Sequence, residues 1–77
     1  MKFLVLSQPE CSYCQKAVDL LDKSSLDCEV ININDNPLMK TLLSMANLKT
    51  VPQIFKANGR YIGGFTDLKA SLGLTLL

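Results

Sequence analysis

The first half of the chain alternates between short apolar runs and a segment with helical periodicity. Residues 2–7 form a near-continuous apolar run that ends before a proline, which is typical of a strand covered on both faces. The apolar positions that follow recur on one helical side, and they predict an amphipathic helix from about 12 to 25. Residues 28–33 predict a second strand, with Cys28 and Val30 among its apolar contacts. Because a helix joins the two strands, we expect them to be parallel.

A helix-start signal opens the next segment. Asn36 can cap a helix and Pro37 suits a first helical turn, so the pair predicts a helix that ends near Asn47. The apolar positions of this helix recur at helical spacing: Leu38, Met39, Leu42, Leu43 and Met45. We expect Met39 and Met45 to fill gaps in the core, because methionine adapts to irregular spaces.

Two further short runs, 51–56 and 60–63, predict a pair of adjacent strands. Asn58 and Gly59 lie between them and favour a positive φ at both positions, which predicts a tight hairpin. The two strands are therefore expected to be antiparallel.

Residues 66–74 predict a short closing helix, capped by Thr66 or Asp67. The apolar tail 72–77 is explained by packing of this helix, with contact to a partner as the alternative. The element order is β-α-β-α-β-β-α, an α/β fold in which helices flank a mixed four-stranded sheet. The whole chain, 1–77, is expected to form a single domain.

Composition removes several classes of function. The formal net charge is +1, which gives no broad electrostatic footprint for nucleic acid or for an anionic membrane. Histidine is absent, so Cys-His and Ser-His nucleophilic machinery and zinc sites that need imidazole are excluded.

The cellular compartment is predicted from two absences. The opening apolar run is far shorter than the ~7 to 15 residues of a signal-peptide core, and no run approaches the ~20 residues that span a bilayer. The three cysteines form an odd set, which argues against a secreted disulfide scaffold. We expect a cytoplasmic protein.

Two cysteines three positions apart, Cys11 and Cys14, carry the candidate chemistry. They lie where the first strand meets the first helix, within reach of a disulfide that closes a very small ring. Cys11 is at the helix N-terminus, where unpaired N–H groups and the helix dipole favour a thiolate, which is the nucleophilic form. We predict that Cys11 attacks a disulfide and that Cys14, one turn into the helix, resolves the intermediate.

Two structural interpretations compete with this one. The pair could be half of a zinc site, but no second pair and no histidine completes the ligands, so no metal site is predicted. The pair could also be inert buried thiols, but the polar residues around it predict an exposed loop. Cys28, by contrast, is predicted to be a small apolar residue of the core.

Three separated blocks resemble the glutaredoxin family, whose members have a thioredoxin-like fold. The blocks are Cys11-Ser12-Tyr13-Cys14, Thr50-Val51-Pro52-Gln53-Ile54-Phe55 and Ile62-Gly63-Gly64-Phe65-Thr66-Asp67-Leu68. Their order and spacing match the family, and the likeness covers about residues 2 to 72.

The resemblance also implies a set of binding residues for glutathione. Pro52 would follow a cis peptide bond and face the dithiol, and the backbone of Val51, next to Thr50, would pair with the cysteine of glutathione. The γ-glutamyl end would bind where the last helix starts, at Gly64, Phe65, Thr66 and Asp67, and Tyr13 would lie beside the glutathione cysteine. Gly63 and Gly64 suit a close approach of backbone to a ligand.

The chain departs from the family at two positions. Gln8 stands where the family usually has a lysine, so one cation near the thiolate and the glycine carboxylate of glutathione is missing. Lys16 or Lys49 could replace that cation, although a solvated lysine is the simpler interpretation of each. Ser12 stands where proline is commonest in the family. Loops that lack this proline are similar to those of members that can hold a [2Fe–2S] cluster between two subunits, and such a cluster would here be bound by Cys11 and glutathione.

The resemblance therefore implies a glutathione-dependent thiol–disulfide oxidoreductase, acting as a monomer. Its expected partners are glutathione, disulfide-bonded or glutathionylated proteins, and ribonucleotide reductase, with no tightly bound cofactor. Two alternatives stay open at this point: recharging by thioredoxin reductase in place of glutathione, and an iron–sulfur carrier bridged by Cys11 and glutathione.

Overall fold

The strands and helices follow the order predicted from the sequence, with one short addition. The structure is a computed structural model that describes residues 2–48 and 50–73. Its elements are β1 (Phe3–Ser7), α1 (Ser12–Lys23), β2 (Cys28–Asn32), the 3₁₀ helix η1 (Ile33–Asp35), α2 (Pro37–Met45), β3 (Gln53–Phe55), β4 (Tyr61–Gly63) and α3 (Phe65–Ser71).

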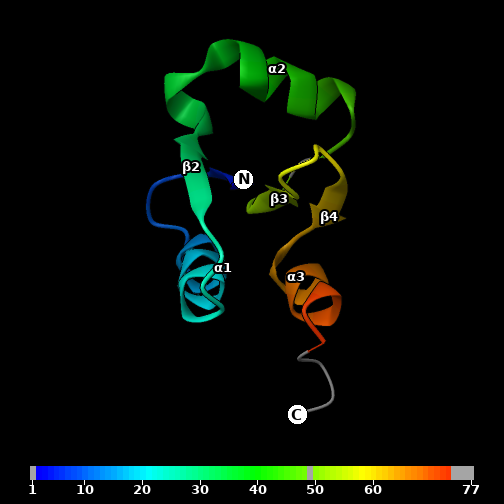
Figure 1. Cartoon of the computed structure of the whole chain (residues 1–77). Coiled ribbons are helices and arrows are strands. Elements are labelled where there is room, and N and C mark those ends of the chain that lie inside the picture. Colours follow the sequence, from blue (N-terminus) through cyan, green and yellow to red (C-terminus); the bar gives the residue numbers. More distant parts are fainter. Residues whose placement is uncertain (1, 49, 74–77) are drawn as a thin grey trace.

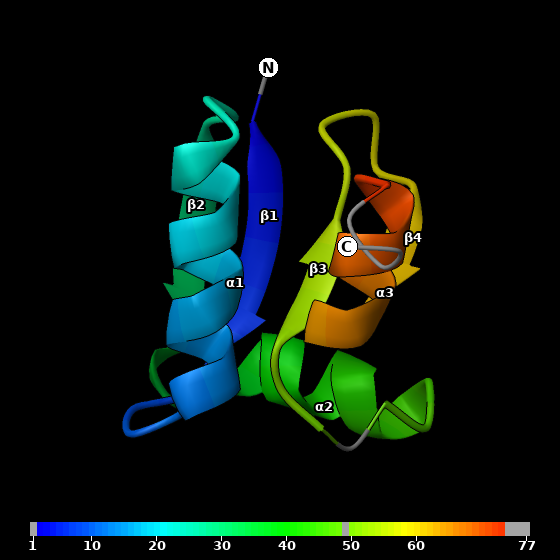
Figure 2. The same cartoon turned by 90° about the horizontal axis from the view of Figure 1, so that it is seen from below.

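The strands form one mixed sheet in the order β2-β1-β3-β4. Strands β1 and β2 are parallel, from the pair Phe3 and Cys28 to the pair Ser7 and Asn32. Strand β3 runs antiparallel to both β1 and β4. Helices α1 and α3 cover one face of the sheet and α2 lies across the other (Figures 1 and 2). The predicted mixed four-stranded sheet with flanking helices is confirmed.

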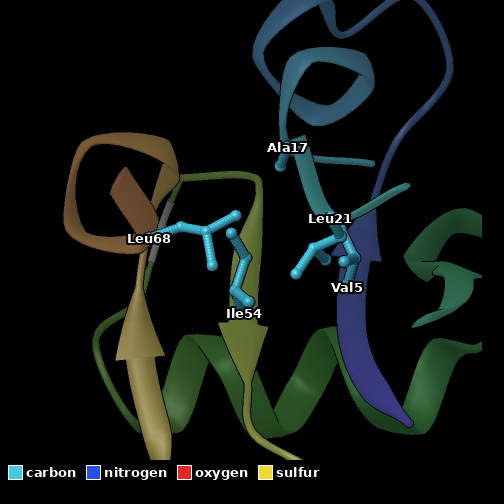
Figure 3. Packing of buried hydrophobic residues seen from close by; sticks show 5 residues of the cluster. All are labelled: Val5, Ala17, Leu21, Ile54 and Leu68. Atoms are coloured by element: carbon cyan, nitrogen blue, oxygen red, sulfur yellow. The ribbon is translucent and has the colours of Figure 1, made fainter. Parts of the chain in front are cut away.

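Strand β1 is buried on both faces, as its continuous apolar run predicts. Val5 belongs to the cluster that β1, β3, α1 and α3 form on one face, where all five fully covered members have 0% exposure: Val5, Ala17, Leu21, Ile54 and Leu68 (Figure 3). Leu6 points to the opposite face and packs with Ile33 and Leu43. The central strand therefore joins two separate cores.

Helix α2 begins as predicted but buries fewer residues than expected. The side-chain oxygen of Asn36 accepts a hydrogen bond from the Met39 N–H at 3.1 Å, which confirms the cap. Met39 packs against the second core, whereas Met45 is 78% exposed, so the prediction that Met45 fills the core is wrong. Two residues beyond the buried Leu43 correspond to about 200° of helical rotation, and this turns Met45 toward solvent.

The hairpin between β3 and β4 forms with a different turn from the predicted one. Gly59 has a φ of 89°, but the φ of Asn58 is not positive, so the expectation of a positive φ at both residues is wrong. The side-chain oxygen of Asn58 instead accepts the Arg60 N–H at 3.0 Å, and the Gly59 N–H binds the Lys56 carbonyl at 2.8 Å. The asparagine thus closes the turn with its side chain rather than with its backbone.

Helix α3 begins one residue earlier than predicted. Its N-cap is Gly64, and Asp67 accepts the Gly64 N–H from the third helical position at 3.1 Å, so Thr66 is not the cap. Leu72 packs against the first core, as expected for the start of the apolar tail, and residues 74–77 lie outside the described residues. None of the helices in the described part of the chain has the length and apolar character needed to cross a membrane.

Strand β2 is an edge strand whose two faces differ. Cys28 packs against the first core and Ile31 against the second. Val30 points toward the α1 side but remains 49% exposed. It therefore contributes less to the core than the sequence predicts.

Candidate active site

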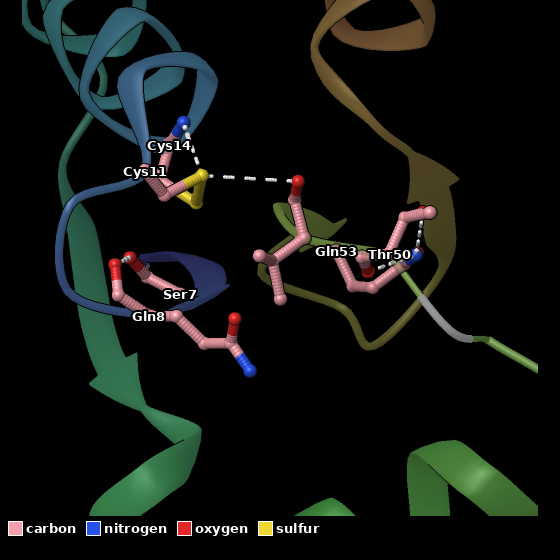
Figure 4. The surroundings of a disulfide bond; sticks show 7 residues. Ser7, Gln8, Cys11, Cys14, Thr50 and Gln53 are labelled. Carbon is pink, nitrogen blue, oxygen red and sulfur yellow. Dashed lines mark hydrogen bonds between the residues drawn. A yellow bond between two sulfur atoms is a disulfide. The ribbon is translucent and has the colours of Figure 1, made fainter.

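The loop after β1 places Cys11 at the N-cap of α1. Glu10 has a φ of 60°, a left-handed conformation that turns the chain just before the helix. Cys11 itself is extended, and its sulfur accepts a hydrogen bond from the Cys14 N–H at 3.2 Å (Figure 4). The sulfur therefore occupies the position at which an N-cap side chain satisfies an otherwise unpaired amide.

Cys11 and Cys14 are joined by a disulfide, with 5.2 Å between their Cα atoms. Cys14 is 3% exposed, whereas Cys11 is half-buried. An incoming thiolate or disulfide thus reaches the Cys11 sulfur more readily. This asymmetry favours Cys11 as the attacking residue and Cys14 as the internal one.

The peptide bond between Val51 and Pro52 is cis, as the family resemblance implies. The Cys11 sulfur lies 3.8 Å from the Val51 carbonyl oxygen, so the turn directly faces the disulfide. The predicted third strand starts only at Gln53, because the two preceding residues form this turn instead of pairing in the sheet.

All the predicted glutathione contacts other than the disulfide line a single groove of about 360 Å³. It lies between the cis-proline turn, the start of α1 and the start of α3. The predicted residues in its wall are Tyr13, Thr50, Val51, Pro52, Gly64, Phe65, Thr66 and Asp67. We call this space the cis-proline groove.

Two aromatic rings in the wall of the cis-proline groove, those of Tyr13 and Phe65, each have a lysine ammonium nearby. The rings of Tyr13 and Phe65 are 5.9 Å apart between centroids. The Lys16 ammonium lies 4.7 Å from the Tyr13 centroid, and the Lys69 ammonium lies 5.7 Å from the Phe65 centroid. Lys16 thus contacts the Tyr13 ring in a cation–π arrangement. Lys49, the other proposed substitute for the missing family lysine, lies outside the described residues.

The end of β4, just before α3, requires a glycine at position 63. This residue has a φ of 127°, and a Cβ there would collide with the side chain of Asp67. The same carboxylate accepts the Gly64 N–H. The close approach of backbone and carboxylate fixes the start of α3, which lines one end of the groove.

Gln53 and Tyr61 also line the cis-proline groove, and sequence reasoning did not assign them to the site. Gln53 is 4% exposed, and its amide nitrogen donates to the Thr50 carbonyl at 2.7 Å. The Tyr61 hydroxyl donates to the Gln53 side-chain oxygen. Gln53 therefore links β4 to the cis-proline turn, and a lone buried amide in an apolar strand was the available signal.

A smaller cavity of about 230 Å³ adjoins the same turn on its other side. Gln8 and Lys40 line it together with Thr50 and Val51. Among the described residues in its wall, Lys40 is the one cation. Lys40 of α2 therefore lines the same cavity as Gln8, the residue that stands where the family usually has a lysine.

Cys28 lies apart from the site and has a different environment. Burial raises the pKa of its thiol, and the nearby Asp22 and Asp27 raise the pKa further, while Lys2 opposes them. Cys28 is thus held as a neutral thiol. Among the described residues, no three His, Cys, Asp or Glu side chains gather into a metal-binding group.

A disulfide between two cysteines three positions apart at a strand-to-helix junction, facing a cis-proline turn on this sheet, defines a thioredoxin-like redox protein. The glutaredoxin family model matches residues 2–62. The probable glutaredoxin of Acanthamoeba polyphaga mimivirus is 36% identical over an alignment that covers 86% of this chain and 73% of that protein. The hybrid peroxiredoxin hyPrx5 of Haemophilus influenzae is 32% identical over 65 residues, or 84% of this chain but 27% of that longer protein.

Solved structures agree with the sequence comparisons. Reduced Escherichia coli glutaredoxin is similar with a TM-score of 0.75 and 28% identity, covering 99% of this chain and 98% of its own. The buckwheat glutaredoxin–glutathione complex is similar with a TM-score of 0.75 and 25% identity, covering 96% and 72%. The chain belongs to the glutaredoxin family of thiol–disulfide oxidoreductases.

Proposed function

We propose that this protein reduces protein disulfides and glutathione mixed disulfides by dithiol exchange, with glutathione as its reductant. The observation that carries the proposal is the environment of the Cys11 sulfur. This atom accepts the Cys14 N–H at the N-terminus of α1, is partly exposed, and faces the Val51–Pro52 turn. A negative charge on that sulfur is favoured by the amide and by the helix dipole.

The exchange proceeds in two halves. The Cys11 thiolate attacks one sulfur of the substrate, forms a mixed disulfide and releases the other sulfur as a thiolate, which takes a proton from solvent. Cys14 then loses its proton to solvent and attacks the Cys11 sulfur. This step closes the Cys11–Cys14 disulfide and releases the second substrate thiolate, so two electrons have passed to the substrate.

Two glutathione molecules restore the dithiol. The first glutathione thiolate attacks the Cys11 sulfur, forms a Cys11–glutathione disulfide and releases Cys14 as a thiol after protonation. The second attacks the glutathione sulfur, which yields oxidised glutathione and the free Cys11 thiolate. Only the first of these disulfides requires glutathione to be seated beside Cys11.

The cis-proline groove is where we place glutathione. Its cysteine backbone would pair with Val51, beside Tyr13, and its γ-glutamyl carboxylate would accept hydrogen bonds from the first amides of α3. The Asp67 carboxylate would bind the γ-glutamyl amino group. The convergence of all these residues on one groove supports this placement, as does the similarity to a glutaredoxin solved with glutathione.

We assign the glycine carboxylate of glutathione to Lys40 in place of a lysine at position 8. Lys40 lines the cavity that also contains Gln8 and the backbone of Thr50 and Val51. Lys16 is occupied with the Tyr13 ring. The remaining partners follow from the family resemblance: glutathionylated proteins and ribonucleotide reductase as acceptors. We propose a monomer in the cytoplasm as the working form.

A paired reductase assay tests the proposal. We expect NADPH oxidation when the protein is supplied with glutathione, glutathione reductase and a glutathione mixed disulfide, and none when thioredoxin reductase replaces the glutathione system. Cys28→Ser is the matched control and should retain the activity, whereas Cys11→Ser should lose it. Activity with thioredoxin reductase alone would overturn the choice of reductant.

The division of roles between the two cysteines has its own test. Cys14→Ser should still act on glutathione mixed disulfides, which need one thiol, but should lose the reduction of protein disulfides. Iodoacetamide at pH 6 should label Cys11 of the reduced protein far faster than Cys14. Equal labelling rates, or loss of both activities in Cys14→Ser, would contradict these roles.

A further inference from the structure

A second groove reaches the disulfide from the side of β2. It has a volume of about 600 Å³, and its wall includes Cys11, Cys14 and the exposed side of Val30. Val18 continues it into a hollow of about 260 Å³ that extends to Cys28. None of the residues in these two walls lines the cis-proline groove. We call the two together the α1/β2 groove.

The floor of the α1/β2 groove is apolar next to the disulfide. Val30 is 49% exposed and Val18 is only partly buried, although both are aliphatic. Val30 belongs to β2, the edge strand of the sheet, and Val18 to the facing side of α1. The exposed Val30 and the partly buried Val18, next to the disulfide, form a surface suited to an apolar side chain of a bound polypeptide.

The rim of the α1/β2 groove is acidic. Four of the seven acidic residues of the chain line it: Glu10, Asp19, Asp22 and Asp27. No lysine or arginine is among the described residues of its wall. The net charge of the chain is +1, so this is a local separation of charge and not a property of the whole surface. Of the described residues in the wall of the cis-proline groove, one is acidic, Asp67, and the Lys16 and Lys69 ammonium groups lie near its two aromatic rings.

The thiol of Cys28 lies next to two of these same carboxylates. It lies at the far end of the α1/β2 groove, and Asp22 and Asp27 both raise the pKa of its thiol beyond the effect of burial. Lys2 opposes them but does not line the groove. The four carboxylates of the rim would attract a cationic side chain placed in the groove.

We propose that the α1/β2 groove holds a cationic polypeptide segment of a protein disulfide substrate while its sulfur exchanges with Cys11. This rests on the disulfide exchange proposed above and names the partner of that site. Glutathione and the protein substrate then approach the same sulfur from different grooves, of which the α1/β2 groove has the acidic rim. The exchange itself is unchanged: the substrate disulfide breaks, the Cys11–substrate bond forms, and Cys14 releases the reduced segment.

The test compares two disulfide peptides that differ only in charge. Each has a leucine beside its cysteine, and one carries two lysines where the other carries two glutamates. The reduced protein is freed of reductant and mixed with excess peptide at about 20 mM salt, without glutathione. Mass spectrometry then follows the oxidation of the Cys11–Cys14 dithiol in a single turnover. We expect the lysine peptide to react ~5-fold faster, with the ratio falling toward one at high salt.

Charge-reversal variants locate the effect. Asp19→Lys/Asp22→Lys should abolish or invert the preference. Glu29→Lys/Asp35→Lys makes the same change in net charge outside the groove and should keep most of the preference. Both variants should reduce the small uncharged disulfide of 2-mercaptoethanol at the wild-type rate. Circular dichroism checks that they fold.

Three results would overturn the inference: equal rates for the two peptides, faster reaction of the glutamate peptide, or equal loss of preference in both variants. The last would mean that net charge and not the groove selects the peptide. Each leaves the proposed function intact when the glutathione-coupled assay succeeds. Failure of that assay alone, with the peptide preference present, would instead remove glutathione as the reductant.

Discussion

The two faces of the sheet differ in how completely their apolar side chains are buried. On the face covered by α1 and α3, five side chains are removed from solvent completely. On the face covered by α2, the three buried members keep between 1% and 7% of their surface, and Leu38, Leu42 and Met45 on α2 are at least half exposed. One helix crossing the sheet cannot cover what two helices cover on the other side (Figures 1 and 2).

The difference follows the location of the chemistry. Both helix starts of the candidate site, Cys11 on α1 and Gly64 before α3, belong to the tightly packed face. Ala17, Leu21 and Leu68 anchor those two helices to Val5 and Ile54. A site that depends on sub-ångström placement of a sulfur against a turn needs helices that do not shift. The α2 face contributes Lys40 to the neighbouring cavity and tolerates looser packing.

The largest effect should follow from a cavity in the tight face. Leu21→Ala removes a fully buried side chain under α1 and should lower the free energy of unfolding by ~3 to 4 kcal/mol. Leu43→Ala in the α2 face should lower it by ~2 kcal/mol, because Leu43 already borders open space. Urea unfolding of the oxidised proteins measures both. Equal losses would show that the two faces stabilise the fold to the same extent.

A smaller loss of stability, with a larger loss of function, should follow from Gln53→Leu. The substitution leaves the Tyr61 hydroxyl and the Thr50 carbonyl without their partner, at a cost of ~1 to 3 kcal/mol. Because Gln53 holds the turn that faces Cys11, we also expect a higher KM for glutathione with kcat changed less.

Tyr61→Phe is the matched control for Gln53→Leu, since it removes one hydroxyl and leaves the Thr50 contact in place. Its KM for glutathione should stay within about twofold of the wild type, as expected for a loss of ~0.4 kcal/mol or less. A KM for glutathione in Gln53→Leu equal to the wild-type value would contradict a positioning role for this amide.

Much of the tight face could be predicted from the sequence, because its pattern is local. The apolar run of β1, the period of α1 and the cysteine spacing each depend on neighbours within about one helical turn. The Asn36 cap was equally local, and it is confirmed. The cis bond before Pro52 followed from the resemblance and not from the pattern.

The features that were missed depend on contacts between distant segments. The partnership of Tyr61 with Gln53 could not be read from strand pairing, because the register between β3 and β4 shifts at Ile54 and Phe55. Asn58 had two ways to close its turn, through its backbone or through its side chain, and the sequence favours both. An aspartate such as Asp67 can be the N-cap residue of a helix, or it can be the third helical residue and accept a hydrogen bond from the N-cap N–H. The structure shows the second arrangement, because Gly64 is the N-cap.

Cys28 gives a pH test of the tight face. Its pKa is raised in the folded protein by burial and by Asp22 and Asp27, so the folded state holds this proton more tightly than the unfolded state. The resulting stabilisation is complete below the unfolded pKa of ~8.5 and is lost as the pH rises through the higher folded value. In the oxidised protein, the wild type should therefore lose more stability between pH 7 and pH 10 than Cys28→Ala does. Parallel curves for the two proteins would contradict the raised pKa.

The smallest effect should come from the exposed side of α2. Met45→Ala trims a side chain that is 78% exposed and replaces it with a better helix former, so the free energy of unfolding should change by less than ~0.5 kcal/mol. Met39→Ala, six residues earlier on the side packed against the second core, should lower the free energy of unfolding by ~1 to 2 kcal/mol. Urea unfolding of the pair measures how α2 is rotated on the sheet. Equal losses from the two truncations would mean that Met45 is covered in solution, and the contrast between the two faces of the sheet would then be smaller than the structure indicates.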